Sequence, residues 1–206
     1  MSCRPVIFDP MEWIYVMKLA WTLLPELSFR EDLLATQTAG RLGEVDIRVL
    51  KDLDWGEPVV YMPPFEKTAY GTVVVAVEGY TVKKLQRHGV KADVVVSDMD
   101  FEPDGLSEVR HVVMHIHGDN YWKVPKRGWI YTVQTWPIGC THNISGFTDG
   151  DRAIYLAYYM GAKKVTISGF YPQVAVKRDD WVKRKKLKIA SHLVERLARR
   201  IDVKLF

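Results

Sequence analysis

Residues 109–120 read Val-Arg-His-Val-Val-Met-His-Ile-His-Gly-Asp-Asn, an apolar run that ends in two histidines, a carboxylic acid and an amide. The apolar part, residues 109–116, is typical of a buried β-strand. The polar part therefore follows the carboxyl end of that strand. Open α/β sheets bind their ligands at this end of their strands, so the stretch predicts both a sheet and a site.

A second stretch follows the same plan. Residues 91–100 read Lys-Ala-Asp-Val-Val-Val-Ser-Asp-Met-Asp, and the valine run predicts another buried strand. Its end delivers Asp98 and Asp100, spaced so that both carboxylates point to one face and could bind one hard cation such as Mg²⁺. A solvated acidic turn is the alternative. We favour the magnesium site because the pair follows the strand directly and Asp104-Gly105 comes after it.

The chain has 206 residues, 48% of them hydrophobic, which is enough to bury a full core without metals or disulfides as staples. Its two cysteines, Cys3 and Cys140, are too few and too far apart for a disulfide framework, and neither belongs to a Cys-x-x-Cys pair. The N-terminus has no signal-peptide core, and no apolar stretch is long enough to span a bilayer. We therefore expect a cytoplasmic protein with no membrane partner.

The formal net charge of +4 is a mild excess that suits small anionic ligands. It falls well short of the basic stripe of a dedicated nucleic-acid binder. A basic run at residues 183–188 keeps nucleic acid open as an alternative, but an acid-rich crevice would repel its phosphates unless cations were present. We therefore do not expect a nucleic-acid partner.

The first part of the chain, before Pro63-Pro64, has a mixed pattern. Apolar residues at helical spacing predict a helix over residues 10–24, which a proline then stops. A capping box at Ser28 predicts a second helix through residue 35, and residues 45–50 read as a strand. We expect residues 1–64 to form a small, mostly helical N-terminal subdomain that packs on the core.

The rest of the chain, residues 65–206, alternates between strand and helix patterns and is expected to form an α/β domain that carries the site. Such alternation predicts βαβ units and a mainly parallel sheet that helices cover on both faces. The expected strands lie at residues 72–77, 93–97, 109–116, 129–134, 164–168 and 203–206, and the expected helices at 82–88, 149–160 and 180–200.

A third polar stretch, residues 145–152, reads Ser-Gly-Phe-Thr-Asp-Gly-Asp-Arg and opens the helix expected from residue 149. Thr148 is placed to cap this helix with Asp151 reciprocating, and acids in a first turn stabilise the helix dipole without any ligand. A helix N-terminus that binds bare phosphate normally lacks carboxylates, so Asp149 and Asp151 also suit a divalent cation. The residues alone leave both interpretations open.

His115 and His117 lie on the same face of the expected strand, a spacing that zinc enzymes also use. The sequence supplies no obvious third nitrogen ligand. Hydrogen bonding is therefore the favoured role for both histidines.

Three polar motifs, at residues 97–100, 115–120 and 146–153, occur in an order that resembles the archaeal 6-hydroxymethyl-7,8-dihydropterin pyrophosphokinase family. Each motif is weak alone, but three in order are specific. That family is similar in fold to the catalytic domain of thiamine pyrophosphokinase, which implies a three-layer α/β sandwich. The chain departs from the family pattern at Phe101, where the acidic turn is usually followed by glycine, and at Glu78-Gly79, where Asp-Gly is more usual.

The resemblance implies a magnesium-dependent enzyme that transfers the β,γ-diphosphate of ATP to the hydroxymethyl group of a dihydropterin and releases AMP, in tetrahydrofolate or methanopterin biosynthesis. Phosphoryl transfer rests on positioning and on cations that neutralise phosphate charge, which suits these residue types. The resemblance implies a metal site at Asp98, Asp100, Asp149 and Asp151; catalytic roles for Asp98, Asp100, His117, Asp119 and Arg152; and substrate contacts from His115, Asn120, Gln134, Thr148, Lys183 and Lys186.

Several alternatives stay open at this point. His117 or Asp119 is the candidate base for the hydroxyl group, and either one could instead bind the pterin ring. The enzyme could act on another alcohol, as thiamine pyrophosphokinase does, or the chain could be a non-catalytic nucleotide-binding or nucleic-acid-binding protein. The expected partners are ATP and a pterin alcohol, and a homodimer is left open.

Overall fold

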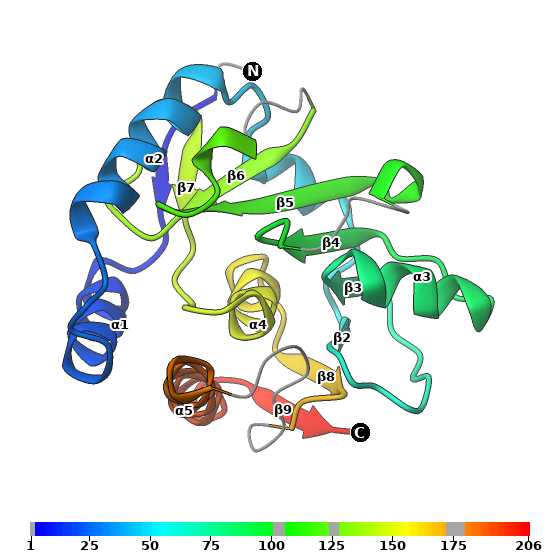
Figure 1. Ribbon diagram of the computed structural model, residues 1–206. Coiled ribbons are helices and arrows are strands. Elements are labelled where there is room, and N and C mark those ends of the chain that lie inside the picture. The colour runs from blue at the N-terminus through cyan, green and yellow to red at the C-terminus, as the bar shows by residue number, and fades with distance from the viewer. Residues whose placement is uncertain (1–2, 101–105, 124–127, 172–179) are drawn as a thin grey trace.

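The computed structural model describes residues 3–100, 106–123, 128–171 and 180–206. Within these residues nine parallel strands form one sheet, in the order β1-β7-β6-β5-β4-β3-β2-β8-β9 (Figure 1). None of the described helices is long and apolar enough to cross a bilayer. The strands are β1 (Val6–Ile7), β2 (Val59–Tyr61), β3 (Val74–Val77), β4 (Val94–Ser97), β5 (His111–Ile116), β6 (Ile130–Val133), β7 (Thr141–Asn143), β8 (Lys164–Ser168) and β9 (Asp202–Leu205).

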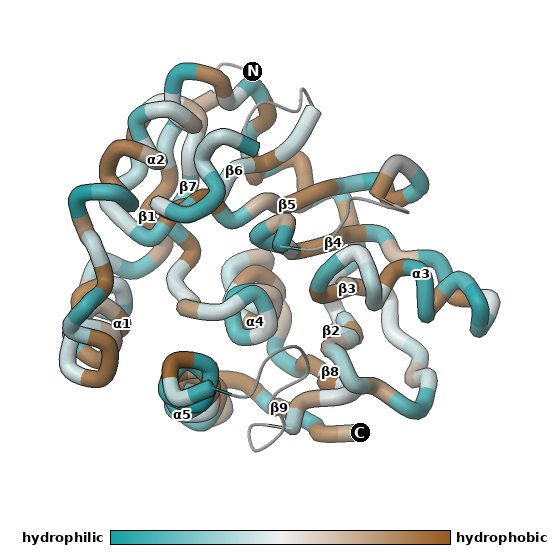
Figure 2. The backbone as a smooth tube through the Cα atoms, in the orientation of Figure 1, coloured by the Kyte–Doolittle hydropathy of each residue, from teal (hydrophilic) through white to brown (hydrophobic). Residues whose placement is uncertain are grey.

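Helices cover both faces of the sheet. They are α1 (Pro10–Leu23), α2 (Phe29–Leu42), α3 (Gly79–Arg87), α4 (Asp149–Tyr159) and α5 (Trp181–Leu197), with short 3₁₀ helices η1 (Ile47–Asp52), η2 (Leu106–Glu108) and η3 (Tyr121–Lys123). Side chains alternate along each strand, so Val94 and Val96 belong to the core on the face that α1, α4 and α5 cover, whereas Val95 belongs to the core on the face that α2 and α3 cover. The central strands are accordingly largely hydrophobic (Figure 2). The three-layer sandwich with a parallel sheet is confirmed.

The first part of the chain differs from its prediction. The expected strand over residues 45–50 is wrong, because Asp46 accepts the backbone N–H of Arg48 at 2.9 Å and caps η1 instead. Ile47 and Leu50 are both buried, at the spacing of one helical turn. The strands β1 and β2 also come from residues 1–64, and β2 lies between β3 and β8 inside the sheet.

The parallel topology gathers strand ends along one edge of the sheet. From β2 to β6 each strand lies beside its predecessor, and after β7 the chain crosses back through α4 to place β8 on the other side of β2. Because all strands run in the same direction, the residues that follow β3, β4, β5 and β6 emerge at the same edge. This edge is where open parallel sheets bind ligands.

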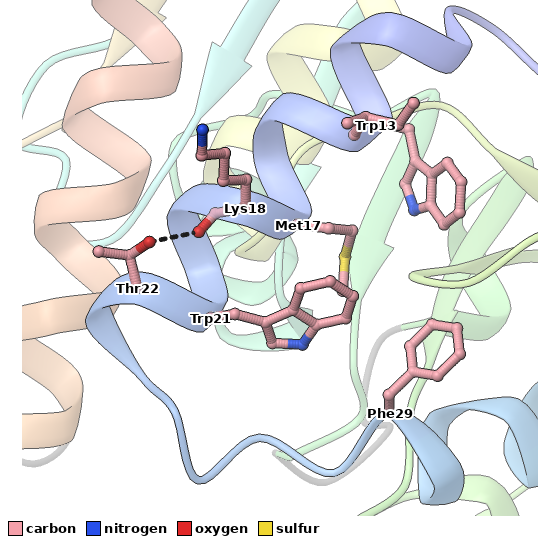
Figure 3. A pocket seen from close by; sticks show the side chains of 7 residues that line it. Trp13, Met17, Lys18, Trp21, Thr22 and Phe29 are labelled. Carbon is pink, nitrogen blue, oxygen red and sulfur yellow. Dashed lines mark hydrogen bonds between the residues drawn. The ribbon is translucent and has the colours of Figure 1, made fainter.

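The helices α1 and α2 meet at a corner rich in aromatic side chains (Figure 3). Trp21 of α1 and Phe29 at the start of α2 pack edge to face, with ring centroids 5.8 Å apart. On the same helix, the indole nitrogen of Trp13 donates to the carbonyl of Gln134 at 2.8 Å, just beyond β6. This bond attaches α1 to the ligand-binding edge of the sheet.

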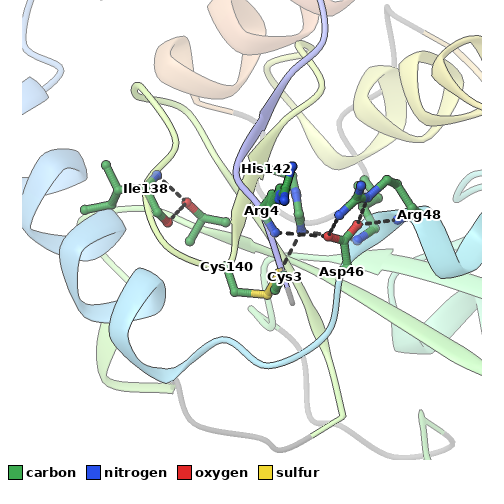
Figure 4. Close-up of a disulfide and its surroundings, with 9 residues drawn as sticks. Cys3, Arg4, Asp46, Arg48, Ile138, Cys140 and His142 are labelled. Carbon is green, nitrogen blue, oxygen red and sulfur yellow. Dashed lines mark hydrogen bonds and ion pairs between the residues drawn. A yellow bond between two sulfur atoms is a disulfide. The ribbon is translucent and has the colours of Figure 1, made fainter. Parts of the chain in front are cut away.

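A disulfide joins Cys3 to Cys140 (Figure 4), although the two cysteines were expected to be too few and too far apart for a disulfide framework; their predicted separation is wrong. They are 137 positions apart in sequence, but their Cα atoms are 5.3 Å apart. The reason is the pairing of β1 with β7, which sets Val6 opposite His142 and thereby brings the preceding residues of both strands together. Only this long-range pairing makes the bond geometrically accessible.

His142, next to this disulfide, is fully buried, and its Nε2 accepts the backbone N–H of Ile47 at 3.2 Å. Burial lowers the pKa of His142 to about 4, with Asp46 opposing and Arg48 assisting the shift. In the folded protein the His142 ring therefore stays neutral down to about pH 4, whereas in the unfolded chain it is protonated near pH 6.5.

We expect the protein to lose stability as the pH falls from 7.5 to 5, because only the unfolded state gains a proton on this ring in that range. The contribution of His142 is about 2 kcal/mol. Urea unfolding at the two pH values should show this loss, and the difference should shrink by about the same amount in His142→Gln. The carboxylate of Asp46, whose pKa is held low by Arg48, affects stability only at more acidic pH. An unchanged pH dependence in the variant would contradict the assignment.

Candidate active site

Three carboxylates meet at the ligand-binding edge of the sheet. Glu78 follows β3, Asp98 follows β4, and Asp149 begins α4. One oxygen atom from each lies within 4.8 Å of the others. Oxygen ligands with negative charge are those that Mg²⁺ prefers, so this group fits the expected magnesium ion. A second group among the described residues, Cys3, Cys140 and His142, contains the two disulfide sulfurs, which are not thiolates and make poor ligands.

Glu78 is held in place by its backbone and by one hydroxyl group. Its φ is 71°, in the left-handed region that side chains other than glycine rarely adopt. Its N–H donates to the carbonyl of Val96 at 2.9 Å, and its carboxylate accepts the hydroxyl of Ser97 at 2.7 Å. Sequence reasoning missed Glu78 as a ligand, although it follows a valine-rich strand in the same way as Asp98.

Asp98 sits in a tight turn at the end of β4. Its carboxylate accepts the N–H of Asp100 at 2.9 Å, and the N–H of Met99 donates to the Ser97 hydroxyl at 3.0 Å. The side chain of Asp98 is 20% exposed, whereas that of Asp100 is 54% exposed and lies 3.8 Å from the ammonium of Lys123. The structure thus groups Asp98 with Glu78 and directs Asp100 toward solvent.

Asp149 and Asp151 have different surroundings, although both open α4. One oxygen of Asp149 is buried within the group of three carboxylates. Asp151 is fully buried and accepts the N–H groups of Phe147 at 2.5 Å and Thr148 at 2.8 Å, together with the Thr148 hydroxyl. Burial raises the pKa of Asp151, and these bonds oppose the rise. Thr148 and Asp151 therefore form a helix cap.

Behind the carboxylates lies a buried polar network centred on Arg152, which is fully buried. Its guanidinium donates to the carbonyl of Ser145 at 3.0 Å and to the Gln134 side chain at 2.8 Å. It also lies 3.3 Å from Nε2 of His115, and burial next to this cation holds the pKa of His115 well below its usual value. Arg152 therefore links the loop before α4 to the ends of β5 and β6. This structural position differs from the catalytic role that we expected for Arg152.

The turn after β5 is fastened by Asn120, which is fully buried. Its amide nitrogen donates to the carbonyls of Asp98 and His115, both at 2.8 Å, and its oxygen accepts the N–H of His117 at 2.9 Å. Asn120 therefore clamps the ends of β4 and β5 together. We expected Asn120 to contact the substrate, but both polar atoms of its side chain form hydrogen bonds with the backbone.

His117 lies at the front of this turn, with Nε2 4.0 Å from a carboxylate oxygen of Asp98. Its Nδ1 accepts the N–H of Asp119 at 3.3 Å. Burial lowers the pKa of His117, while Asp98 and Asp32 oppose the shift. Asp32, from α2, was missed by sequence reasoning; it accepts the N–H of Gly118 at 2.9 Å, and burial raises its pKa.

The basic helix α5 brings one lysine toward the site. Burial is the main cause of the lowered pKa of His115 and His117, and the positive charge of Lys186 lowers both further. Lys183 lies in the first turn of α5, where its N–H donates to the capping carboxylate of Asp180 at 2.8 Å. Lys186 is therefore the better placed of the two lysines to meet a phosphate group.

Three curated archaeal proteins are similar to this chain, and each is named 6-hydroxymethyl-7,8-dihydropterin pyrophosphokinase. The chain is a homologue of these pterin pyrophosphokinases. The relative from Methanothermobacter thermautotrophicus is 33% identical over 153 residues, which cover 64% of this chain and 66% of the relative. The relative from Pyrococcus furiosus is 38% identical over 139 residues, with 59% and 60% covered, and that from Methanocaldococcus jannaschii is 28% identical over 162 residues, with 65% and 66% covered.

The matched region thus spans 60% to 66% of the length of these curated relatives. No protein-family model matches the chain. The resemblance to the archaeal pterin pyrophosphokinase family is confirmed by these homologues.

Proposed function

We propose that the protein transfers diphosphate from ATP to the hydroxymethyl group of 6-hydroxymethyl-7,8-dihydropterin and releases AMP. The observation that carries this proposal is the meeting of Glu78, Asp98 and Asp149 at the ligand-binding edge of the sheet in a homologue of pterin pyrophosphokinases. A carboxylate group of this kind would repel a triphosphate by itself, and it attracts one once a divalent cation is bound.

The three carboxylates would hold Mg²⁺. When bound, this ion supplies positive charge that neutralises the phosphate oxygens as charge spreads over them. Lys186 adds positive charge from α5, and this charge acts on His115 and His117 at the end of β5. Together they would orient the triphosphate for attack by the pterin hydroxyl group.

The hydrogen bonds around His117 help to identify the general base that accepts the proton of the pterin hydroxyl group. Because Nδ1 accepts the N–H of Asp119, the neutral ring carries its proton on Nε2, which faces Asp98. In this tautomer the Nε2–H of His117 lies 4.0 Å from the carboxylate of Asp98, which is too far for a hydrogen bond. Asp119 is exposed in the same turn, and we propose that it accepts the proton of the hydroxyl group.

The decisive experiment is to incubate the purified protein with ATP, magnesium and the dihydropterin alcohol and to identify the nucleotide product. We expect AMP and the pterin diphosphate in equal amounts, with activity that follows added magnesium or manganese. ADP as the product would show transfer of a single phosphate and overturn the proposal. AMP formed with thiamine but not with the pterin would instead support an enzyme of similar fold with another acceptor. Dependence on tightly bound zinc would refute the magnesium assignment.

A further inference from the structure

A cavity of about 400 Å³ lies between α1 and the beginning of α2, at the aromatic corner described above. Figure 3 shows the side chains around it, and those that it labels are Trp13, Met17, Lys18, Trp21, Thr22 and Phe29; Ile14 also lines the cavity. The volume is within the range of pockets that hold small organic ligands. No step of the proposed mechanism uses this cavity.

The cavity is connected to the buried network of the candidate active site through Gln134, which follows β6 and contacts two of the residues that line the cavity. On the cavity side, the amide nitrogen of Gln134 lies 3.9 Å from the sulfur of Met17, and its carbonyl accepts the indole N–H of Trp13. On the other side, its amide oxygen accepts Arg152 at 2.8 Å. A ligand in the cavity would therefore contact Trp13 and Met17, and these two residues contact Gln134, which belongs to the buried network behind the carboxylates.

The walls of the cavity suit a flat aromatic ring. Trp21 and Phe29 form an edge-to-face pair, yet they stay 44% and 37% exposed, so a ligand can still cover them. Two neutral polar groups of the walls already have partners, because the Thr22 hydroxyl donates to the carbonyl of Lys18 at 2.7 Å and the Trp13 indole donates to the carbonyl of Gln134. Lys18 is the only charged residue among those that line the cavity, and its positive charge would not repel a ligand that carries phosphate groups.

We propose that this cavity binds the adenine ring of ATP, an inference that rests on the proposed function. Of the two substrates, the pterin carries more hydrogen-bonding groups on its ring, and burying them without partners would cost about 1–3 kcal/mol each. The cavity supplies few free polar groups for such a ring. Adenine needs fewer partners and gains most of its affinity from stacking.

The test is calorimetric titration of the protein with AMP, and separately with the dihydropterin, without turnover. We expect Trp21→Ala and Phe29→Ala each to weaken AMP binding about tenfold or more, as loss of one stacking partner predicts. Dihydropterin affinity should not change. Leu34→Ala is the matched control, since Leu34 is 50% exposed on α2 but does not line the cavity; it should bind both ligands as the wild type does.

Three results would overturn the proposal. The first is a wild-type protein that binds neither AMP nor magnesium-ATP at millimolar concentration. The second is loss of dihydropterin binding in the two variants with AMP binding retained, which would make the cavity the acceptor site. The third is unchanged binding of both ligands together with a shift from dimer to monomer in sedimentation, which would make the corner an interface between copies. AMP binding at the cavity without diphosphate transfer would support this inference and refute only the proposed function.

Discussion

Asp98→Asn is expected to lower the turnover number by about 10²–10⁴, because a neutral amide replaces a carboxylate that would hold the magnesium ion. A loss of this size corresponds to several kcal/mol of transition-state stabilisation. The fold should survive, since the amide oxygen can still accept the N–H of Asp100 at 2.9 Å. Steady-state kinetics at saturating and limiting magnesium would measure the loss, and thermal unfolding would check the fold.

Two further variants make this result specific. Glu78→Gln should cause a similar loss, and it keeps an oxygen for the Ser97 hydroxyl, which now donates to Glu78 at 2.7 Å. Asp100→Asn is the control two residues away, and we expect less than about a threefold effect because exposed charges act weakly through solvent. Equal losses in Asp98→Asn and Asp100→Asn would indicate that these two carboxylates bind the metal together, as the sequence alone predicted, and would contradict the grouping of Asp98 with Glu78 and Asp149. Near-normal rates in Asp98→Asn would refute the metal site.

Cys3→Ser is expected to lower the free energy of unfolding by about 3–5 kcal/mol. The bond closes a loop across 137 positions, so it removes much conformational freedom from the unfolded chain. It also fastens β1 to the outer edge of the sheet, where β7 is its one partner strand in the described sheet. For a chain of this size, the loss should lower the melting temperature by about 10 °C.

A reducing agent provides the internal control for this second prediction. It should lower the stability of the wild type nearly to that of Cys3→Ser and leave the variant unchanged, whether stability is followed by heat or by urea. A wild type that contains two free thiols by titration, and that responds to reductant no more than the variant does, would show that the bond does not form.

The central architecture follows from patterns that are visible in the sequence. The strands β4 and β5 and the helices α4 and α5 were predicted within a few residues, because each carries a long apolar run or a long helical repeat. The strands β1, β2 and β7 were not predicted, because each has only two or three residues and shows no period. Their positions depend on pairing with strands that are distant in sequence.

Within the candidate site the same division holds. Asp98 could be identified because it directly follows an apolar strand, and Asp149 because it opens a helix. Glu78 follows the same rule, but it was noted only as a departure from the family pattern. The burial of Asp151, Arg152 and Asn120 was not visible, because it depends on which loops close over them.

The sequence by itself determined the alternation of strands and helices, the parallel sheet and the edge at which polar residues collect, because these features come from local periodicity and from the direction of each strand. Only the tertiary structure decided which carboxylates meet, that Cys3 reaches Cys140, and that Trp21 and Phe29 border a cavity next to Gln134. These contacts join residues that are far apart in the chain. Their formation depends on strand order and helix packing, which no local pattern encodes.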